Sequence, residues 1–109
     1  MAWLMRDEQV LAAIDIAESF RERSRGLLGR DGIEGALLLR PSRQVHSFGM
    51  RFPIDVAFCT DDLTVVRTLT LRPGRITRPS LRCRCVIEAE AGAFARWGLR
   101  PGDQLEIRT

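Results

Sequence analysis

Four polar side chains in or beside apolar stretches of this sequence could bind a ligand or transfer a proton: His46, Arg51, Asp55 and Glu88. His46 is the single histidine of the chain and precedes Asp55 by nine residues. Asp55 and Glu88 lie within apolar runs, where a carboxylate is costly to bury unless it is paired. Arg51 or Arg25 could supply that pairing charge. The pattern predicts one polar binding pocket formed by His46, Arg51, Asp55 and Glu88.

The same residues admit other interpretations, which stay open at this point. A histidine titrates near neutrality, so His46 could act with Asp55 in a small hydrolytic or acid–base enzyme. Against this, the chain has no Gly-x-Ser-x-Gly motif, and no nucleophile has a base at a recognisable spacing. A structural role is the third interpretation: His46 could lock a bend around Gly49 and Pro53, and the carboxylates could form ion pairs. We expect a non-catalytic binding module for a small molecule or a protein.

A second candidate is the arginine-rich segment over residues 63–87. It holds six arginines and no acidic residue, whereas residues 1–62 hold 8 arginines and 10 acidic residues, and residues 88–109 hold 3 and 4. The net charge is +3, and all 17 Lys or Arg positions are arginine, which indicates GC-rich coding before it indicates a function. The candidate surface for an acidic partner consists of Arg72, Arg75, Arg78, Arg82 and Arg84.

Nucleic acid is one acidic partner that this segment could bind. Contacts from Arg67–Arg84 to four or five phosphates would give a logarithmic salt slope of about −4. The run lacks interleaved aromatic residues for base stacking, and only 6% of the chain is aromatic. A solvated basic loop is therefore the favoured interpretation, and nucleic acid is not the expected partner. We expect any binding to be weak, independent of sequence and lost near physiological salt.

The three cysteines indicate a reducing environment rather than a disulfide framework. Cys59, Cys83 and Cys85 are an odd number and are expected to be free and buried, with Cys83 and Cys85 facing the same way along one strand. Their spacing does not match a zinc site, so we expect neither a metal ion nor a cofactor. The start of the sequence does not resemble a secretion signal, and no apolar run reaches the roughly 18 residues of a membrane helix, so a cytoplasmic location is expected.

The strands and helices expected to hold these residues are short. A length of 109 residues with 45% hydrophobic and 28% charged residues predicts a single domain over 1–109. Period-two alternation indicates strands; in one of them Ile54, Val56 and Phe58 share one face while Asp55, Ala57 and Cys59 share the other. The expected strands cover residues 10–17, 36–39, two pieces between 45 and 59, 63–71, 83–90 and the end of the chain, and the expected helices cover residues 19–29 and 91–98. The fold class is mainly β (α+β): a compact small β-barrel or sandwich of six to seven short strands with two short helices.

Three stretches together resemble the domain of unknown function 192 family, over nearly the whole chain. They are RSRGLLGR, FPIDVAF, and VIEAEAG followed by GLRPGD. The resemblance implies a small β-rich fold with no established biochemical activity. Many members carry Trp-Met-Lys-Asn before the aspartate, where this chain has residues 48–51, Phe-Gly-Met-Arg, and Glu90 replaces a usual proline. The family signature falls here on Arg25, Gly26, Leu27, Arg30, Pro53, Asp55, Glu88, Gly92, Gly102 and Asp103.

Overall fold

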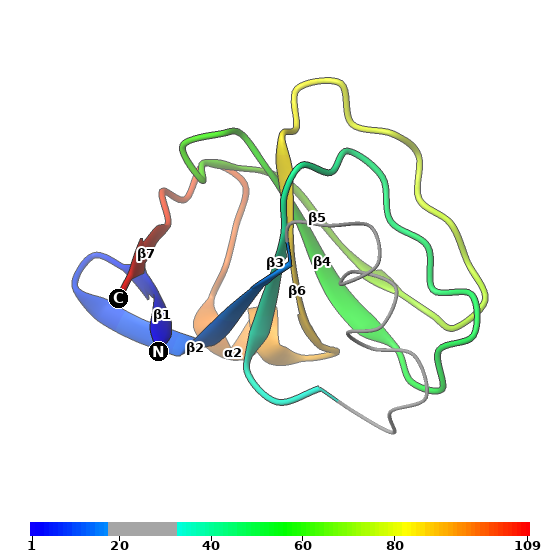
Figure 1. The fold of residues 1–109 in the computed structure, drawn as a ribbon, viewed down its shortest axis with the longest axis horizontal. Coiled ribbons are helices and arrows are strands. Elements are labelled where there is room, and N and C mark those ends of the chain that lie inside the picture. The colour runs from blue at the N-terminus through cyan, green and yellow to red at the C-terminus, as the bar shows by residue number, and fades with distance from the viewer. Residues whose placement is uncertain (18–32) are drawn as a thin grey trace.

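Seven strands form one mixed sheet in the computed structural model, which describes residues 1–17 and 33–109 (Figure 1). The order across the sheet is β5-β4-β6-β3-β2-β1-β7. Only β2 and β3 run parallel among the paired strands, and every other neighbouring pair is antiparallel. The described elements are β1 (Ala2–Arg6), β2 (Gln9–Ala17), β3 (Ala36–Leu39), β4 (Ile54–Cys59), β5 (Val65–Leu71), β6 (Cys85–Glu90), α2 (Ala93–Trp97) and β7 (Glu106–Arg108).

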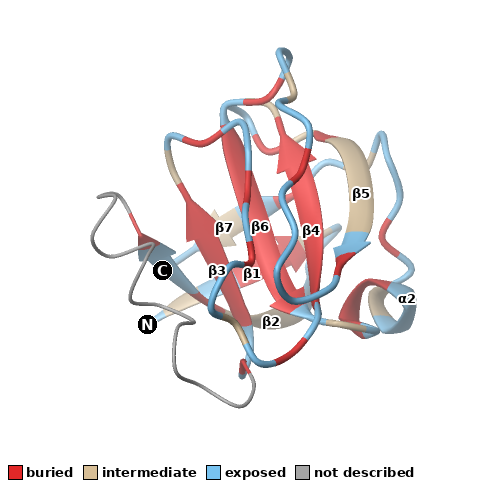
Figure 2. Cartoon of the chain, turned by 90° about the vertical axis from the view of Figure 1, so that its right-hand side faces the viewer, coloured by how far each residue is buried: buried red, intermediate tan, exposed pale blue. Residues whose placement is uncertain are grey.

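The middle of the sheet is covered on both sides, so all six residues of β4 are buried (Figure 2). Ile54, Val56 and Phe58 belong to one apolar cluster, and Ala57 and Cys59 belong to the other. This confirms the predicted alternation along residues 54–59. We call the side of Ala57 and Cys59 the helix face and the side of Ile54, Val56 and Phe58 the loop face.

The helix face is covered by α2 and by the segment that follows it. Phe94, Leu99 and Leu105 are buried in the cluster on this side. The helix ends at Gly98, whose φ of 63° is left-handed, a conformation that glycine adopts without steric penalty. The predicted helix over residues 91–98 and its stop at Gly98 are therefore confirmed.

The loop face is covered by two irregular segments, residues 40–53 and 72–84, which we call the loop layer. Val45, Phe52 and Cys83 from these segments are buried against the sheet. The segments run side by side and exchange backbone hydrogen bonds: the N–H groups of Ser47, Thr77 and Ser80 donate to the carbonyls of Arg75, Val45 and Arg43, each at 2.8 Å. The expected strand piece before Gly49 is reduced to an isolated bridge between His46 and Ile76.

The mainly β architecture of six to seven short strands is confirmed, in a sandwich-like arrangement rather than a closed barrel. The outer strands β5 and β7 do not form a ladder; the isolated bridge between Thr64 and Gln104 links the two ends of the sheet. Of the two expected helices, the one over residues 19–29 lies outside the described residues. Within the part of the chain that the structure describes, no helix combines the length and the apolar composition needed to cross a membrane.

One prediction about the cysteines is wrong. The strand that was expected to begin at Cys83 begins at Cys85, after a turn. Because Cys83 precedes the regular strand, its side chain lies in the cluster of the loop face while Cys85 lies in that of the helix face. The two side chains therefore point to opposite sides of the sheet.

Candidate functional site

Asp55 is a buried carboxylate that holds the start of α2 against the sheet. Its side chain is on the helix face of β4, 4% exposed. Its Oδ1 accepts a hydrogen bond from Thr70 Oγ1 at 2.8 Å, and its Oδ2 accepts from the N–H groups of Gly92 and Phe94 at 3.0 and 3.1 Å. Gly92 precedes the helix and has no side chain to cap it. Asp55 supplies that cap from a neighbouring strand, and both of its oxygens are engaged.

A shallow hollow of about 430 Å³ opens beside Asp55. Thr68, Thr70, Leu99 and Arg100 are among the residues that line it. The carboxylate already accepts three hydrogen bonds. It therefore stabilises the wall of this hollow and is not available as a free acidic group for a ligand.

Glu88 is equally buried, but it lies on the other side of the sheet. Glu88 belongs to β6 and is paired with Val56 of β4 on one side and with Leu37 of β3 on the other. All three side chains lie on the loop face, and Glu88 is 4% exposed. Asp55 is instead paired with Ala89. Directly paired residues share a face, so the register sends the two carboxylates to opposite faces. A single pocket that contains both Asp55 and Glu88 is therefore not formed.

The environment of Glu88 changes its acidity. Burial between apolar strands disfavours the charged form and raises the pKa of Glu88 to about 7. A carboxyl group of this kind exchanges a proton near neutral pH, which the sequence alone did not indicate.

His46 lies in the loop layer and is exposed. Its ring stacks on Phe48, with centroids 5.1 Å apart and an interplanar angle of 21°, and its Nδ1 accepts a hydrogen bond from the Phe48 N–H at 3.3 Å. The loop layer covers the loop face, whereas Asp55 points to the helix face. The acid–base pair of His46 and Asp55 is therefore not formed. Arg51 is exposed in the loop layer, and Arg25 lies outside the described residues.

The candidate arginines lie in one half of the loop layer. All five are exposed, and they come from residues 72–84: Arg72, Arg75, Arg78, Arg82 and Arg84. Ser47 fixes the backbone between two of them, because its buried hydroxyl accepts from the Arg75 N–H at 2.9 Å and donates to the Arg72 carbonyl. Sequence reasoning missed that residues 46–48 lie against this segment and bring an exposed aromatic pair to it. The contact between Ser47 and Arg75 joins residues 28 positions apart, and no local pattern in the sequence predicts it.

The three cysteines differ in acidity. All three are free and buried. A hydrogen bond from the Cys59 thiol to the sulfur of Cys85, and then burial, raise the pKa of Cys59, and burial raises the pKa of Cys83. The same hydrogen bond lowers the pKa of Cys85. Among the described residues, no group of three or more His, Cys, Asp or Glu side chains could hold a metal ion.

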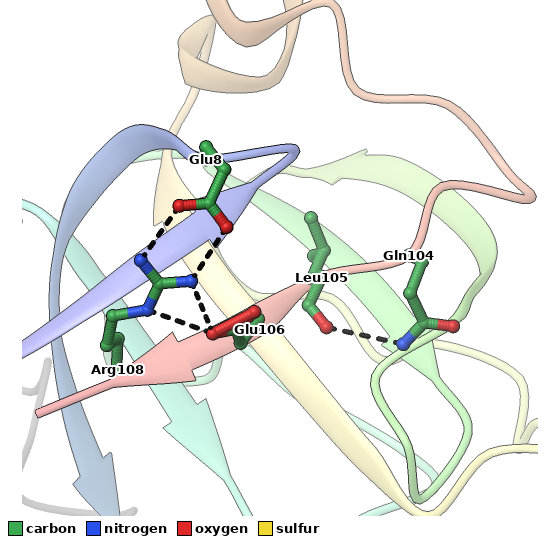
Figure 3. Close-up of polar contacts among 5 residues, drawn as sticks. All are labelled: Glu8, Gln104, Leu105, Glu106 and Arg108. Carbon is green, nitrogen blue, oxygen red and sulfur yellow. Dashed lines mark hydrogen bonds and ion pairs between the residues drawn. The ribbon is translucent and has the colours of Figure 1, made fainter.

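A polar cluster at the opposite edge of the sheet is structural (Figure 3). The guanidinium of Arg108 on β7 lies between the carboxylates of Glu8 and Glu106, with ion pairs of 3.1 and 2.8 Å. The hydrogen bond and the charge of Arg108 lower the pKa of Glu8. The cluster ties the short edge strand β7 to the turn between β1 and β2, and its exposed charges make it a weak contributor to stability.

The signature positions in the described residues have defined roles: Asp55 caps the helix that follows Gly92, and Glu88 is buried opposite Val56. The family model of DUF192, described as "Uncharacterized ACR", matches residues 2–107. This chain belongs to the DUF192 family. The chain is similar to a UPF0127 protein from Pyrococcus abyssi, 32% identical over 85% of this chain and 84% of the relative. It is also similar to a UPF0127 protein from Pyrococcus horikoshii, 33% identical over 72% of this chain and 73% of the relative.

Two crystal structures share the DUF192 fold seen here. A protein of unknown function from Novosphingobium aromaticivorans has a TM-score of 0.77 at 20% identity, covering 96% of this chain and 82% of its own. A protein described as a putative transcription regulator from Sinorhizobium meliloti has a TM-score of 0.79 at 24% identity, covering 96% and 90%. At these identities the similarity establishes the fold alone.

Proposed function

We propose that this DUF192 protein is a non-catalytic binding module whose recognition surface is the outer side of the loop layer and whose partner is an acidic protein segment. The observation that carries the proposal is the combination of exposed apolar side chains with arginines on adjoining loops. Phe48, Ile76 and Leu81 are 51%, 57% and 85% exposed. Aromatic residues and arginine are enriched in protein interfaces, where apolar groups give contact area and charges select the partner.

Electrostatics supports an acidic partner. Residues 63–87 carry six arginines and no carboxylate. A positive segment of this kind attracts an Asp- or Glu-rich chain and repels basic ones. The guanidinium of Arg75 or Arg78 can grip a carboxylate with two parallel hydrogen bonds.

The fixed backbone of the loop layer supports recognition without large rearrangement. Ser47 is fully buried and bonds with the backbone at Arg72 and Arg75. At the other end, one guanidinium NH2 of Arg67 donates to the Arg78 carbonyl at 3.1 Å, while the same side chain lies over the Phe58 ring at 4.4 Å. A surface that is already ordered loses less conformational entropy on binding.

The apolar side chains favour a polypeptide over nucleic acid. Ile76 and Leu81 are aliphatic and provide no platform on which a base could stack. The aromatic pair at this surface, His46 and Phe48, is already stacked ring on ring. A peptide with both carboxylates and apolar side chains matches these groups better than a sugar–phosphate backbone does.

A peptide-display selection tests this proposal. The immobilised chain is panned against a random peptide library and counter-selected with the Arg75→Glu/Arg78→Glu double variant, with an Arg96→Glu/Arg100→Glu variant as a control of equal charge change. We expect enrichment of peptides that combine Asp or Glu with an apolar residue, with at least tenfold weaker binding to the first variant than to the control. Enrichment of peptides that bind both variants equally would contradict the proposal.

A further inference from the structure

A second hollow, of about 490 Å³, lies at the corner where the two halves of the loop layer approach β6. It is lined by two arginines, two prolines and two uncharged polar residues: Arg43, Arg84, Pro41, Pro79, Ser42 and Gln44. The described residues that line it include no carboxylate. A concave site with two guanidinium groups and no opposing acid has the electrostatics of an oxyanion site.

Arg43 is held in place from behind. Its Nε donates to the carbonyl of Cys83 at 3.0 Å, which leaves the two terminal NH2 groups of the guanidinium available. Gln44 is fixed in the same way, because its amide NH2 donates to the Thr77 carbonyl at 2.8 Å. The N–H of Ser42 donates to the Arg84 carbonyl at 3.0 Å, which joins the two walls of the hollow.

A third arginine, Arg40, immediately precedes Pro41 but does not line the hollow. After the hydrogen bond with Cys59, the charge of Arg40 is a further cause that lowers the pKa of the Cys85 thiol, which lies on the helix face. The positive charge of the hollow therefore comes from Arg43 and Arg84.

We infer that this hollow binds a phosphomonoester, with the phosphate between Arg43 and Arg84 and the carbon skeleton against Pro41 and Pro79. A guanidinium pairs with a carboxylate as well as with a phosphate, but a phosphomonoester has three acceptor oxygens and nearly two negative charges, so it can bind both guanidinium groups at once. The hollow is larger than a phosphate group, and its proline walls are rigid and apolar, so an ester fits it better than the free anion does. This site is separate from Phe48 and Ile76, and it does not depend on the proposed recognition of an acidic segment.

Titration with phenyl phosphate, followed by NMR of the arginine side-chain Nε–Hε resonances and by calorimetry, tests the site. We expect the Arg43 and Arg84 resonances to shift and Arg84→Gln to weaken binding at least tenfold. Arg43→Lys keeps the charge but loses the guanidinium fork, and it should weaken binding at least fivefold. Arg100→Gln removes an equal charge at the hollow beside Asp55 and should change the affinity less than twofold. Thermal melts of each variant verify that it is folded.

Two further probes decide the ligand class. Benzoate, which replaces the phosphate with a carboxylate, should bind at least fivefold more weakly than phenyl phosphate, and so should inorganic phosphate, which lacks the carbon skeleton. Equal affinity for benzoate, or equal loss of affinity in Arg84→Gln and Arg100→Gln, would overturn the phosphate site. Equal affinity for inorganic phosphate would overturn its assignment to an ester.

Discussion

Asp55 and Glu88 are carboxylates of equal burial with different surroundings. Asp55 accepts three hydrogen bonds, two of which hold the start of α2 in place. Glu88 lies between Val56 and Leu37, and burial raises its pKa to about 7. The first residue caps a helix, whereas the second is a titratable group close to neutral pH.

Replacing Asp55 tests its role as a cap. Asp55→Ala leaves the buried Phe94 N–H without its acceptor, and we expect a loss of about 3 kcal/mol in the free energy of unfolding. Asp55→Asn retains an acceptor oxygen but loses the charge, and it should lose about 1 kcal/mol. Urea denaturation measures both, with the exposed Glu34→Ala as the control. Losses below 0.5 kcal/mol, the usual range of surface substitutions, would contradict the capping role.

Glu88 makes stability depend on pH in a direction opposite to that of most carboxylates. Its pKa rises from 4.5 to about 7 on folding, so the native state binds the proton more tightly than the unfolded state does. The stabilising effect is complete below about pH 4.5 and is lost as the pH rises to about 7, by about 3 kcal/mol in total.

The variant Glu88→Gln resembles the protonated form and should remove this dependence. We expect it to be more stable than the natural protein at pH 8 by up to about 3 kcal/mol and nearly equal in stability at pH 4.5. Denaturation midpoints from pH 4.5 to pH 8 provide the measurement. The exposed Glu90→Gln, on the same strand, should leave the pH profile unchanged. A parallel pH dependence in Glu88→Gln and the natural protein would show that another group controls it.

At the scale of elements, the close approach of β2 and β3 depends on Gly35. Its φ is +71°, and a Cβ there would lie 2.5 Å from the Ala13 carbonyl oxygen on β2. Gly74 has a similar φ of +76° but open space around it. Gly74→Ala should therefore lose only the conformational preference, about 1 kcal/mol. Gly35→Ala adds a backbone clash and should lose about 2 kcal/mol more. Equal losses in urea denaturation would contradict the close approach.

Local alternation predicted individual strands well. The faces of Ile54, Val56 and Phe58, and the helix that stops at Gly98, follow from spacing and from glycine alone. The strand β1 was not predicted; it forms a hairpin with β2 through Asp7 and Glu8, which adopt positive φ although neither is glycine. A turn built from such residues lacks the usual glycine signal.

The candidate site was less predictable because it depends on register and on loop pairing. Alternation shows that Asp55 and Ala57 share a face, but not that Asp55 is opposite Ala89 rather than Glu88. That one-residue difference in register places Glu88 on the other side of the sheet, so the predicted pocket is not formed. The pairing of His46 with Ile76 is likewise a long-range contact between irregular segments, and these have no periodicity to read.

At the scale of the whole molecule, the sheet separates two surfaces with different properties. Both termini lie at the adjacent strands β1 and β7, away from the loop layer (Figure 1). The helix face bears the hollow beside the fully engaged Asp55, whereas the loop layer bears the exposed Phe48 and Ile76 with the arginine segment. The exposed apolar and positively charged groups that an acidic partner would contact therefore lie in the loop layer.

An NMR titration of the ¹⁵N-labelled protein with an enriched acidic peptide tests recognition by the loop layer. We expect the largest shifts to fall on Phe48, Arg75 and Ile76 and to decline with added salt. The amide resonances of α2 and of Thr70, which lie at the hollow beside Asp55, should not shift. A single-stranded DNA of similar charge should produce smaller shifts that vanish near 150 mM salt, where binding through phosphates alone is weak. If the peptide caused its largest shifts on α2 and Thr70, or if the DNA bound more tightly than the peptide, recognition of an acidic peptide by the loop layer would be contradicted.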